Sequence, residues 1–469
     1  MAKAITGKKF ATNVIVSIAA QIISLAVSVI LNLVVPKLID QYQYSYWQTY
    51  VLYAGYVGVL HFGLLDGLVL RYSRYDYEEL DKARLRSQFA IMLFFTSAVT
   101  VIGAVVSAVI AGGVYRYVAI FVAVAVVTKN VVTYSSYMFQ ITNRISKYAV
   151  LIIAQRMSYG LVVVILLSCG VGDFYWYCIA DLIGDLIGIA IGFIYNRGLY
   201  FGKTVKLREA LKELKANISS GILLMLANWS AMLIVGGAKM IIQWRWDEIT
   251  FAKASFAFSV ANLFLVFVTA ISVVLFPSLK RVDEDKLPAM YKTIRDILSP
   301  LLFFCMIFYF LGCWLLKLWL PKYSDSLIYL GLLLPIIIYS SKVSLLTNNY
   351  LKVYRKEKVM LIVNLISIAL GAIAFSLSAY VFDSLYAVLI SVVCVIMFNS
   401  VLSEICVLRV IKTKLVKDFI IEGAMTAGFI LAASLLNLWM GCLVYCAMFA
   451  LYCLINYKSI AATLKLIFT

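Results

Sequence analysis

The sequence has few charged residues and almost no histidine. Of its 469 residues only 14% are charged and 64% are hydrophobic, whereas soluble domains are about a quarter charged and about half apolar. The chain is therefore not a soluble globular protein, and its length has to be divided into membrane spans of about 20 residues. The single histidine, His61, excludes a metal site built on histidines.

Sequence motifs for catalysis are also lacking. The nine cysteines lie in apolar stretches without a CxxC pair, so we expect reduced, buried thiols. The segment from Gly198 to Thr204 resembles a phosphate-binding loop, but it is one residue short and follows a membrane helix instead of a strand. Ser/His/Asp, Cys/His and paired-carboxylate hydrolase patterns are absent. We therefore predict a protein that is not an enzyme and needs neither cofactor nor metal.

What the sequence does contain is a long series of apolar stretches, each of which we expect to be a membrane-spanning helix. The fourteen stretches are 13–35, 48–70, 88–111, 117–139, 148–169, 174–195, 218–241, 251–276, 297–319, 326–349, 358–381, 384–408, 419–439 and 441–456. The predicted fold is an all-α polytopic membrane protein of about fourteen transmembrane helices.

The net charge of +18 predicts the orientation of these helices. With the N-terminus in the cytoplasm, 31 of the 41 Lys and Arg residues fall in cytoplasmic segments, six in outer segments and four within spans. This split follows the positive-inside rule and predicts a multi-pass protein with both termini cytoplasmic. The positive charge thus indicates topology, with no nucleic-acid partner, and favours contact with anionic membrane lipid.

A repeat of six spans is indicated by matching residues in the two halves. Asn13 and Asn217 open the first and seventh spans, and Lys129 and Lys342 lie in the fourth and tenth. We predict an N-terminal lobe at 1–196, a C-terminal lobe at 218–410, and spans thirteen and fourteen with the tail at 411–469. The segment 197–217 is expected to be a cytoplasmic amphipathic linker helix on the membrane surface, or else a plain solvated linker.

Ionisable residues inside the spans are the candidate functional residues, because each is costly in a bilayer. Arg156 is expected at the depth of Asp185, and either pairs with Asp181 or Asp185 or faces a cavity. Lys129 and Lys342 have no evident partner on their own spans. We expect both to face a water-filled cavity, the alternative being an ion pair with an unplaced carboxylate.

The remaining candidates have competing interpretations. His61 is either a satisfied polar residue or a proton relay, and Asp66 either caps or pairs near the inner surface or couples transport to an ion. Lys239 lies close enough to the outer face to extend its ammonium to water. The combined candidate sets are Lys129, Arg156, Lys342 and Lys239 as cationic substrate contacts, and Asp66, Asp181, Asp185 and His61 as ion-coupling residues.

Several short segments resemble those of one transporter family. They are Gly63 to Gly67 running to Arg71 and Arg74, Asn143-Arg144 with Lys147-Tyr148, Leu214-Lys215 running into Ser220-Gly221, and Asn348-Asn349 with Lys356 to Lys358. With the fourteen-span plan, they resemble the Wzx-type flippases of O-antigen, capsule and exopolysaccharide, within the multidrug/oligosaccharidyl-lipid/polysaccharide exporter superfamily. The chain departs from this family at two places in the seventh span. It has Gly221-Ile222-Leu223 where the family often has Gly-Leu-Pro, and Ala238-Lys239 where the family often has Asp-Arg.

The resemblance implies two six-helix lobes around a central cavity, with two extra C-terminal helices. It implies transfer of an undecaprenyl-diphosphate-linked oligosaccharide from the inner to the outer leaflet of the bacterial inner membrane. The implied mechanism is alternating access, coupled to H⁺ or Na⁺, with other polysaccharide assembly proteins as partners. The alternatives are an ion-coupled multidrug exporter, which would need an acidic cavity, and a polysaccharide polymerase or ligase, which would need a large outer loop.

Overall fold

Every regular element among the described residues is a helix, as the sequence predicts. The structure is a computed structural model that describes the chain except residues 1–18, 20, 74, 280–283, 413–415 and 458–469, and the side chains of 266, 267, 269–278, 284, 416 and 417. Asn13 and Arg74 therefore lie outside the described residues. The chain divides into two compact units, Met1–Trp229 (the N unit) and Ser230–Thr469 (the C unit).

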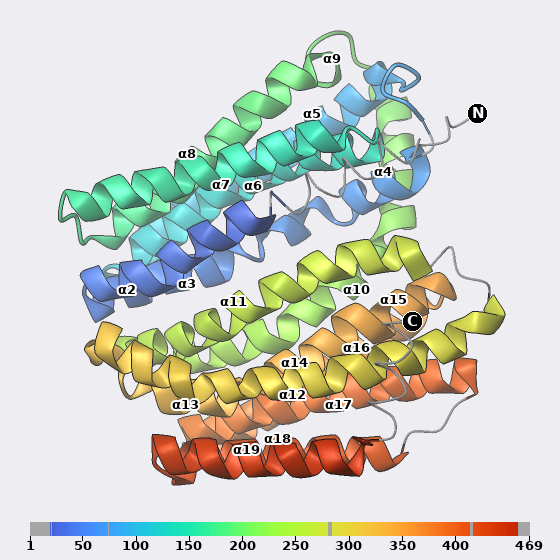
Figure 1. Cartoon of the computed structure of the whole chain (residues 1–469). Coiled ribbons are helices and arrows are strands. Elements are labelled where there is room, and N and C mark those ends of the chain that lie inside the picture. Colours follow the sequence, from blue (N-terminus) through green and yellow to red (C-terminus); the bar gives the residue numbers. More distant parts are fainter. Residues whose placement is uncertain (1–18, 20, 74, 280–283, 413–415, 458–469) are drawn as a thin grey trace. The chain divides into compact units, whose positions relative to one another are not determined.

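The N unit consists of helices that run side by side, with α6 in contact with α5, α7 and α8 (Figure 1). Its elements are η1 (Ile30–Val34), α2 (Val35–Leu38), α3 (Gln41–Ala54), η2 (Val57–His61), α4 (Leu64–Tyr72), α5 (Lys82–Ile110), α6 (Tyr115–Ile141), α7 (Ile145–Ser168), α8 (Phe174–Tyr195), α9 (Arg197–Tyr200) and the first part of α10 (Leu207–Arg245). One of its buried cores gathers Leu65, Leu85, Tyr134 and Leu199.

The C unit begins within α10 and is also a set of adjacent helices, among which α17 contacts α13, α14 and α16. Its further elements are α11 (Glu248–Leu279), η3 (Glu284–Lys286), α12 (Leu287–Trp319), η4 (Pro321–Tyr323), α13 (Ser326–Leu333), α14 (Ile336–Ser341), η5 (Lys342–Thr347), α15 (Asn348–Val353), α16 (Glu357–Ser376), η6 (Leu377–Val381), α17 (Leu385–Ile411), α18 (Val416–Leu435) and α19 (Leu438–Ile455). The segment 207–217, predicted as a linker helix, is continuous with the seventh span in α10.

The predicted polytopic membrane fold is confirmed. Among the described residues, eleven helices are long and apolar enough to cross a membrane, and two bent helix pairs raise the number to thirteen. The remaining predicted span, 251–276, lies within α11, a helix of 32 residues. At 1.5 Å per residue this helix is about 48 Å long, which exceeds the hydrocarbon thickness of a bilayer.

Large apolar side chains are exposed over much of the helix surface. On α5 alone, Val105, Val109 and Ile110 are 58%, 76% and 79% exposed. Soluble monomers rarely expose contiguous apolar patches of this kind. Lipid is the solvent that makes such a surface stable, and intrahelical hydrogen bonds satisfy the backbone within it.

The second and tenth spans are each bent at a residue that disrupts the helix. The second span bends by 54° between η2 and α4, where Phe62 and Gly63 have φ angles of 50° and 79°, a region that glycine adopts without strain. The tenth bends by 40° between α13 and α14. There Pro335 lacks the amide hydrogen of a continuous helix and its ring clashes with the preceding turn.

Glycines allow α4 and α10 to cross with their backbones in contact. A Cβ atom on Gly63 would lie 2.6 Å from the backbone nitrogen of Ile222, and one on Gly221 would overlap the carbonyl oxygen of Gly63. Close approach of this kind is the usual role of small residues at helix interfaces in membranes. Gly63 and Gly221 both belong to the sequence segments in which the chain resembles the flippase family.

We expect Gly221→Ala to destabilise the protein, because its methyl group has no space between α10 and α4. Overpacking of this kind costs about 1–3 kcal/mol, which should lower the melting temperature of the detergent-solubilised protein. Gly237→Ala is the matched control on the same helix, since no atom lies within 4 Å of its Cβ position. It should be neutral or stabilising by up to ~1 kcal/mol. Equal melting temperatures for the two variants would contradict the close crossing.

Candidate intramembrane charge sites

Lys129, Asp181 and Asp185 form one ionic cluster in the N unit, which we call the N cluster. The Lys129 ammonium donates to Asp181 Oδ2 at 2.7 Å and lies 3.4 Å from Asp185 Oδ2. The two aspartates are one turn apart on α8, so both face α6, which is packed against it. Lys129 therefore forms the ion pair that sequence analysis had kept as the alternative to a water-filled cavity. Its partners are the two carboxylates that had been considered for Arg156.

Neutral hydrogen-bond donors complete the N cluster. Asp185 accepts hydrogen bonds from Thr128 Oγ1 at 3.0 Å and Gln155 Nε2 at 2.7 Å, and Asp181 accepts one from the Tyr50 hydroxyl at 2.8 Å. Asp185 is fully buried, whereas the Lys129 and Asp181 side chains are 25% and 16% exposed. The cluster thus has a fixed, closed end at Asp185 and an accessible end where Lys129 meets Asp181.

Arg156 is exposed and forms no ion pair with any residue that the structure describes. Its neighbour Gln155 faces α8, where it bonds Asp185. Consecutive helical residues point about 100° apart, so Arg156 is turned away from α8. Of the two interpretations that the sequence left open for Arg156, pairing with Asp181 or Asp185 is not formed, and its guanidinium is left available to another anion.

Lys129 and Arg156 lie at matching depths. Lys129 is twelve residues from the end of α6 at Ile141, and Arg156 is eleven residues from the start of α7 at Ile145, where the chain turns back. At 1.5 Å per residue, both are about 17–18 Å from that end of the unit. The N unit therefore carries two cations near the middle of a membrane about 30 Å thick.

The C unit contains a second, larger ionic cluster, formed by Arg295, Lys342, Glu404 and Glu422 and called the C cluster here. The Lys342 ammonium lies 2.6 Å from both Glu404 Oε2 and Glu422 Oε2. Arg295 joins the same carboxylates, at 2.6 Å from Glu404 and 2.9 Å from Glu422. The Tyr291 hydroxyl donates to Glu404 at 3.0 Å. Four helical segments, α12, η5, α17 and α18, are joined by this network.

The four residues of the C cluster are balanced in charge and buried, unlike the N cluster, and a third carboxylate, the 29% exposed Asp418, lies 3.5 Å from Arg295 at its edge. Its four charges cancel, and the side chains of Lys342, Glu404, Arg295 and Glu422 are 0%, 0%, 4% and 4% exposed. Lys342 thus forms the ion pair that sequence analysis had kept as the alternative to a water-filled cavity. Removing one partner from such a buried network costs about 3–5 kcal/mol. A substrate could reach Lys342 only after these ion pairs had opened, so the geometry favours a structural role.

The remaining candidates lie apart from both clusters. His61 Nε2 is 3.9 Å from Asp66 Oδ2, and the Gly63 amide donates to His61 Nδ1 at 3.1 Å, so this buried pair lies at the bend of the second span. Lys239 lies over the Phe258 ring with its ammonium 5.9 Å from the ring centre. The structure thus brings together Lys129, Asp181 and Asp185, and separately His61 and Asp66.

Sequence analysis missed Arg295 and the two glutamates of the C cluster. Glu404 and Glu422 lie in predicted spans or at their borders, and an acid there needs a partner just as a lysine does. Glu404, Glu422 and Lys342 all lie within predicted spans and had no evident partners in the sequence. Their opposite charges therefore indicated that they could pair with one another. Arg295 gave no such signal, because it lies in a basic segment at the start of the ninth span.

Comparisons with known proteins identify the fold. No protein-family model matches the chain, and no curated protein sequence does. The lipid II flippase MurJ in an inward closed conformation is similar in structure with a TM-score of 0.66 at 13% identity, covering 94% of this chain and 98% of its own. An inward-facing multidrug resistance MATE family transporter of the MOP superfamily has a TM-score of 0.61 at 13% identity, with coverages of 84% and 98%.

A further similar structure shows the other side of the transport cycle in this fold. An outward-facing MATE family transporter of the MOP superfamily has a TM-score of 0.56 at 12% identity, covering 85% of this chain and 95% of its own. Structural similarity at sequence identities of 12–13% is evidence for a shared fold, but it does not identify the substrate. The chain therefore has the all-α membrane fold of these flippase and transporter structures.

Proposed function

We propose that the protein is a flippase that moves a polyprenyl-diphosphate-linked oligosaccharide from the inner to the outer leaflet of the bacterial cytoplasmic membrane. The observation that carries the proposal is the pair of accessible cations, Lys129 and Arg156, at one depth near the middle of the N unit. A diphosphate needs positive charge to leave water, and arginine and lysine are its usual ligands. The same fold in a lipid II flippase supports this class of substrate.

Arg156 is the primary diphosphate contact in this proposal, since it has no competing carboxylate among the described residues. Lys129 is the second contact, released from Asp181 as the phosphate approaches. Lys239, in the C unit, is proposed as a separate substrate contact, with its ammonium 5.9 Å from the centre of the Phe258 ring. Lys342 is left out, because its ammonium is fully buried between two carboxylates.

Asp181 is the proposed coupling residue. When a substrate phosphate takes Lys129, the Asp181 carboxylate loses its cation and can bind H⁺ or Na⁺ instead. Asp185 keeps its hydrogen bonds from Thr128 and Gln155 and so holds the cluster in place. The His61–Asp66 pair at the bend of the second span is the alternative coupling site. Alternating access of the kind seen in inward- and outward-facing MATE transporters is the proposed mechanism.

Deletion of the gene from its bacterium tests the proposal. We expect polyprenyl-linked oligosaccharide to accumulate on the cytoplasmic side and the surface polysaccharide to be lost, both restored by the wild-type gene. Lipid extraction with mass spectrometry, and staining of the surface polymer, measure the two effects. Normal surface glycan together with new drug sensitivity would contradict the flippase and support a multidrug exporter.

A further inference from the structure

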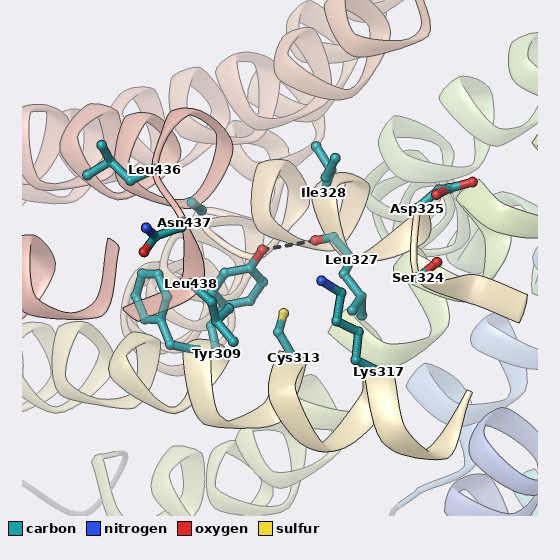
Figure 2. Close-up of a pocket in the computed structure, with 12 residues that line it drawn as sticks. Tyr309, Cys313, Lys317, Ser324, Asp325, Leu327, Ile328, Leu436, Asn437 and Leu438 are labelled. Atoms are coloured by element: carbon teal, nitrogen blue, oxygen red, sulfur yellow. Dashed lines mark hydrogen bonds between the residues drawn. The ribbon is translucent and has the colours of Figure 1, made fainter. Parts of the chain in front are cut away.

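A cavity of about 410 Å³ lies at one end of the C unit. It is open on one side and lined by the end of α12, the start of α13 and the turn between α18 and α19. Its lining includes Tyr309, Lys317, Asp325, Leu436 and Asn437 (Figure 2). The volume is within the range of about 300–1,000 Å³ that is typical of small-molecule sites. The orientation predicted by the positive-inside rule puts this end of the unit at the outer face of the membrane.

The charges at this cavity leave one cation without a partner. Asp325 is bonded to the Lys253 ammonium at 2.6 Å, so its charge is compensated. Lys317 has no ion pair with any residue in the described part of the chain, and its ammonium extends into the space beside the Cys313 thiol (Figure 2). With the Asp325 carboxylate compensated by Lys253, the charge of Lys317 is left uncompensated in the lining and favours an anion.

The walls of the cavity combine polar and lipid-facing surfaces. Asn437 and Ser324 supply polar groups to the lining, while Phe310 and Leu438 are apolar. Next to it the exposed side chains of α12 are apolar, with Trp314 43% and Leu318 67% exposed. A tryptophan and a lysine at the end of a span are typical of the level of lipid headgroups. An occupant with an anionic head and an apolar tail fits both surfaces.

We propose that this cavity binds the headgroup of an anionic phospholipid, with its phosphate on Lys317 and its acyl chains along the exposed face of α12. The site is separate from the N cluster and does not depend on the substrate of transport. The lipid bound there would join α12 to the turn between α18 and α19, and would thus stabilise the packing of the last two spans on the C unit.

Thermal unfolding of the purified full-length protein in neutral detergent tests this site. We expect phosphatidylglycerol to raise the melting temperature of the wild type, whereas phosphatidylcholine and inorganic phosphate leave it unchanged. Lys317→Gln should need about fivefold more phosphatidylglycerol for half of the effect, which corresponds to ~1 kcal/mol. Lys356→Gln is the matched control, because it removes one exposed positive charge from the same unit without lining the cavity.

The outcomes separate the possible ligands. A titration with phosphatidylglycerol that is the same for the wild type and Lys317→Gln would overturn the site. Equal weakening by Lys356→Gln would also overturn it, because the effect would then be one of overall charge. An increase in melting temperature with inorganic phosphate alone, lost in Lys317→Gln, would replace the lipid by a free phosphate and contradict the proposal.

Discussion

Lys129→Met is expected to lower export of the lipid-linked oligosaccharide about 10- to 100-fold, with a normal amount of folded protein in the membrane. A hydrogen bond between an ammonium and a phosphate contributes about 1.5–3 kcal/mol, and its loss at the diphosphate gives a change of this size. The protein should still fold, because Asp181 is 16% exposed and can take up a proton once the lysine is gone. The buried Asp185 keeps its hydrogen bonds from Thr128 and Gln155. Export per folded molecule, from surface polysaccharide and membrane protein levels, measures the effect.

A double variant distinguishes substrate binding from simple neutralisation of Asp181. If Lys129 serves only to neutralise the carboxylate, Lys129→Met with Asp181→Asn should restore export. If the ammonium binds the diphosphate, the double variant should stay as inactive as Lys129→Met. Export at the wild-type rate in Lys129→Met would contradict a role for this lysine in transport.

Lys342→Met is expected to act on stability instead, destabilising the folded protein by about 3–5 kcal/mol. Its ammonium lies between Glu404 and Glu422, both almost fully buried. Its removal leaves Arg295, which also lies 3.5 Å from Asp418, to compensate both glutamates alone. The yield of monodisperse protein and its melting temperature should both fall. Export per folded molecule should stay within about twofold of the wild type.

A compensating substitution tests whether charge balance is the cause. Lys342→Met with Glu404→Gln removes one charge of each sign and leaves the Arg295–Glu422 pair at 2.9 Å. This double variant should recover at least half of the lost stability. Wild-type stability in the single variant, or a selective loss of export with normal folding, would contradict the structural role of the C cluster.

Most of the fold could be predicted because bilayer thickness and the cost of exposed backbone leave few choices. The length of the apolar stretches fixed the spans. Gly184, Gly188 and Gly192 recur every four residues on α8, a spacing that favours close helix packing. A Cβ atom on Gly184 would lie 2.8 Å from the Gln155 carbonyl oxygen of α7. The bends in the second and tenth spans were not predicted, although Gly63 and Pro335 mark both.

The charge pairing was harder to predict, because it depends on which helices touch and how each is rotated. Adjacency in sequence suggested Arg156 for the aspartates of α8. In the structure α7 is turned so that Gln155, the residue before Arg156, faces Asp185. Lys129 reaches Asp181 from α6. Periodicity within one helix shows which residues share a face, as it did for the two aspartates. It does not show which neighbour that face meets.

Reconstitution of the purified protein tests the central claim most directly. Lipid-linked oligosaccharide extracted from the deletion strain is placed in sealed proteoliposomes, and its arrival at the outer leaflet is followed with an added glycan-cleaving enzyme. We predict that the wild type exposes the inner-leaflet pool, that Lys129→Met does so about 10- to 100-fold more slowly, and that protein-free liposomes do not. If folded wild-type protein moved the lipid-linked oligosaccharide to the outer leaflet no faster than protein-free liposomes do, the assignment as a flippase would be contradicted.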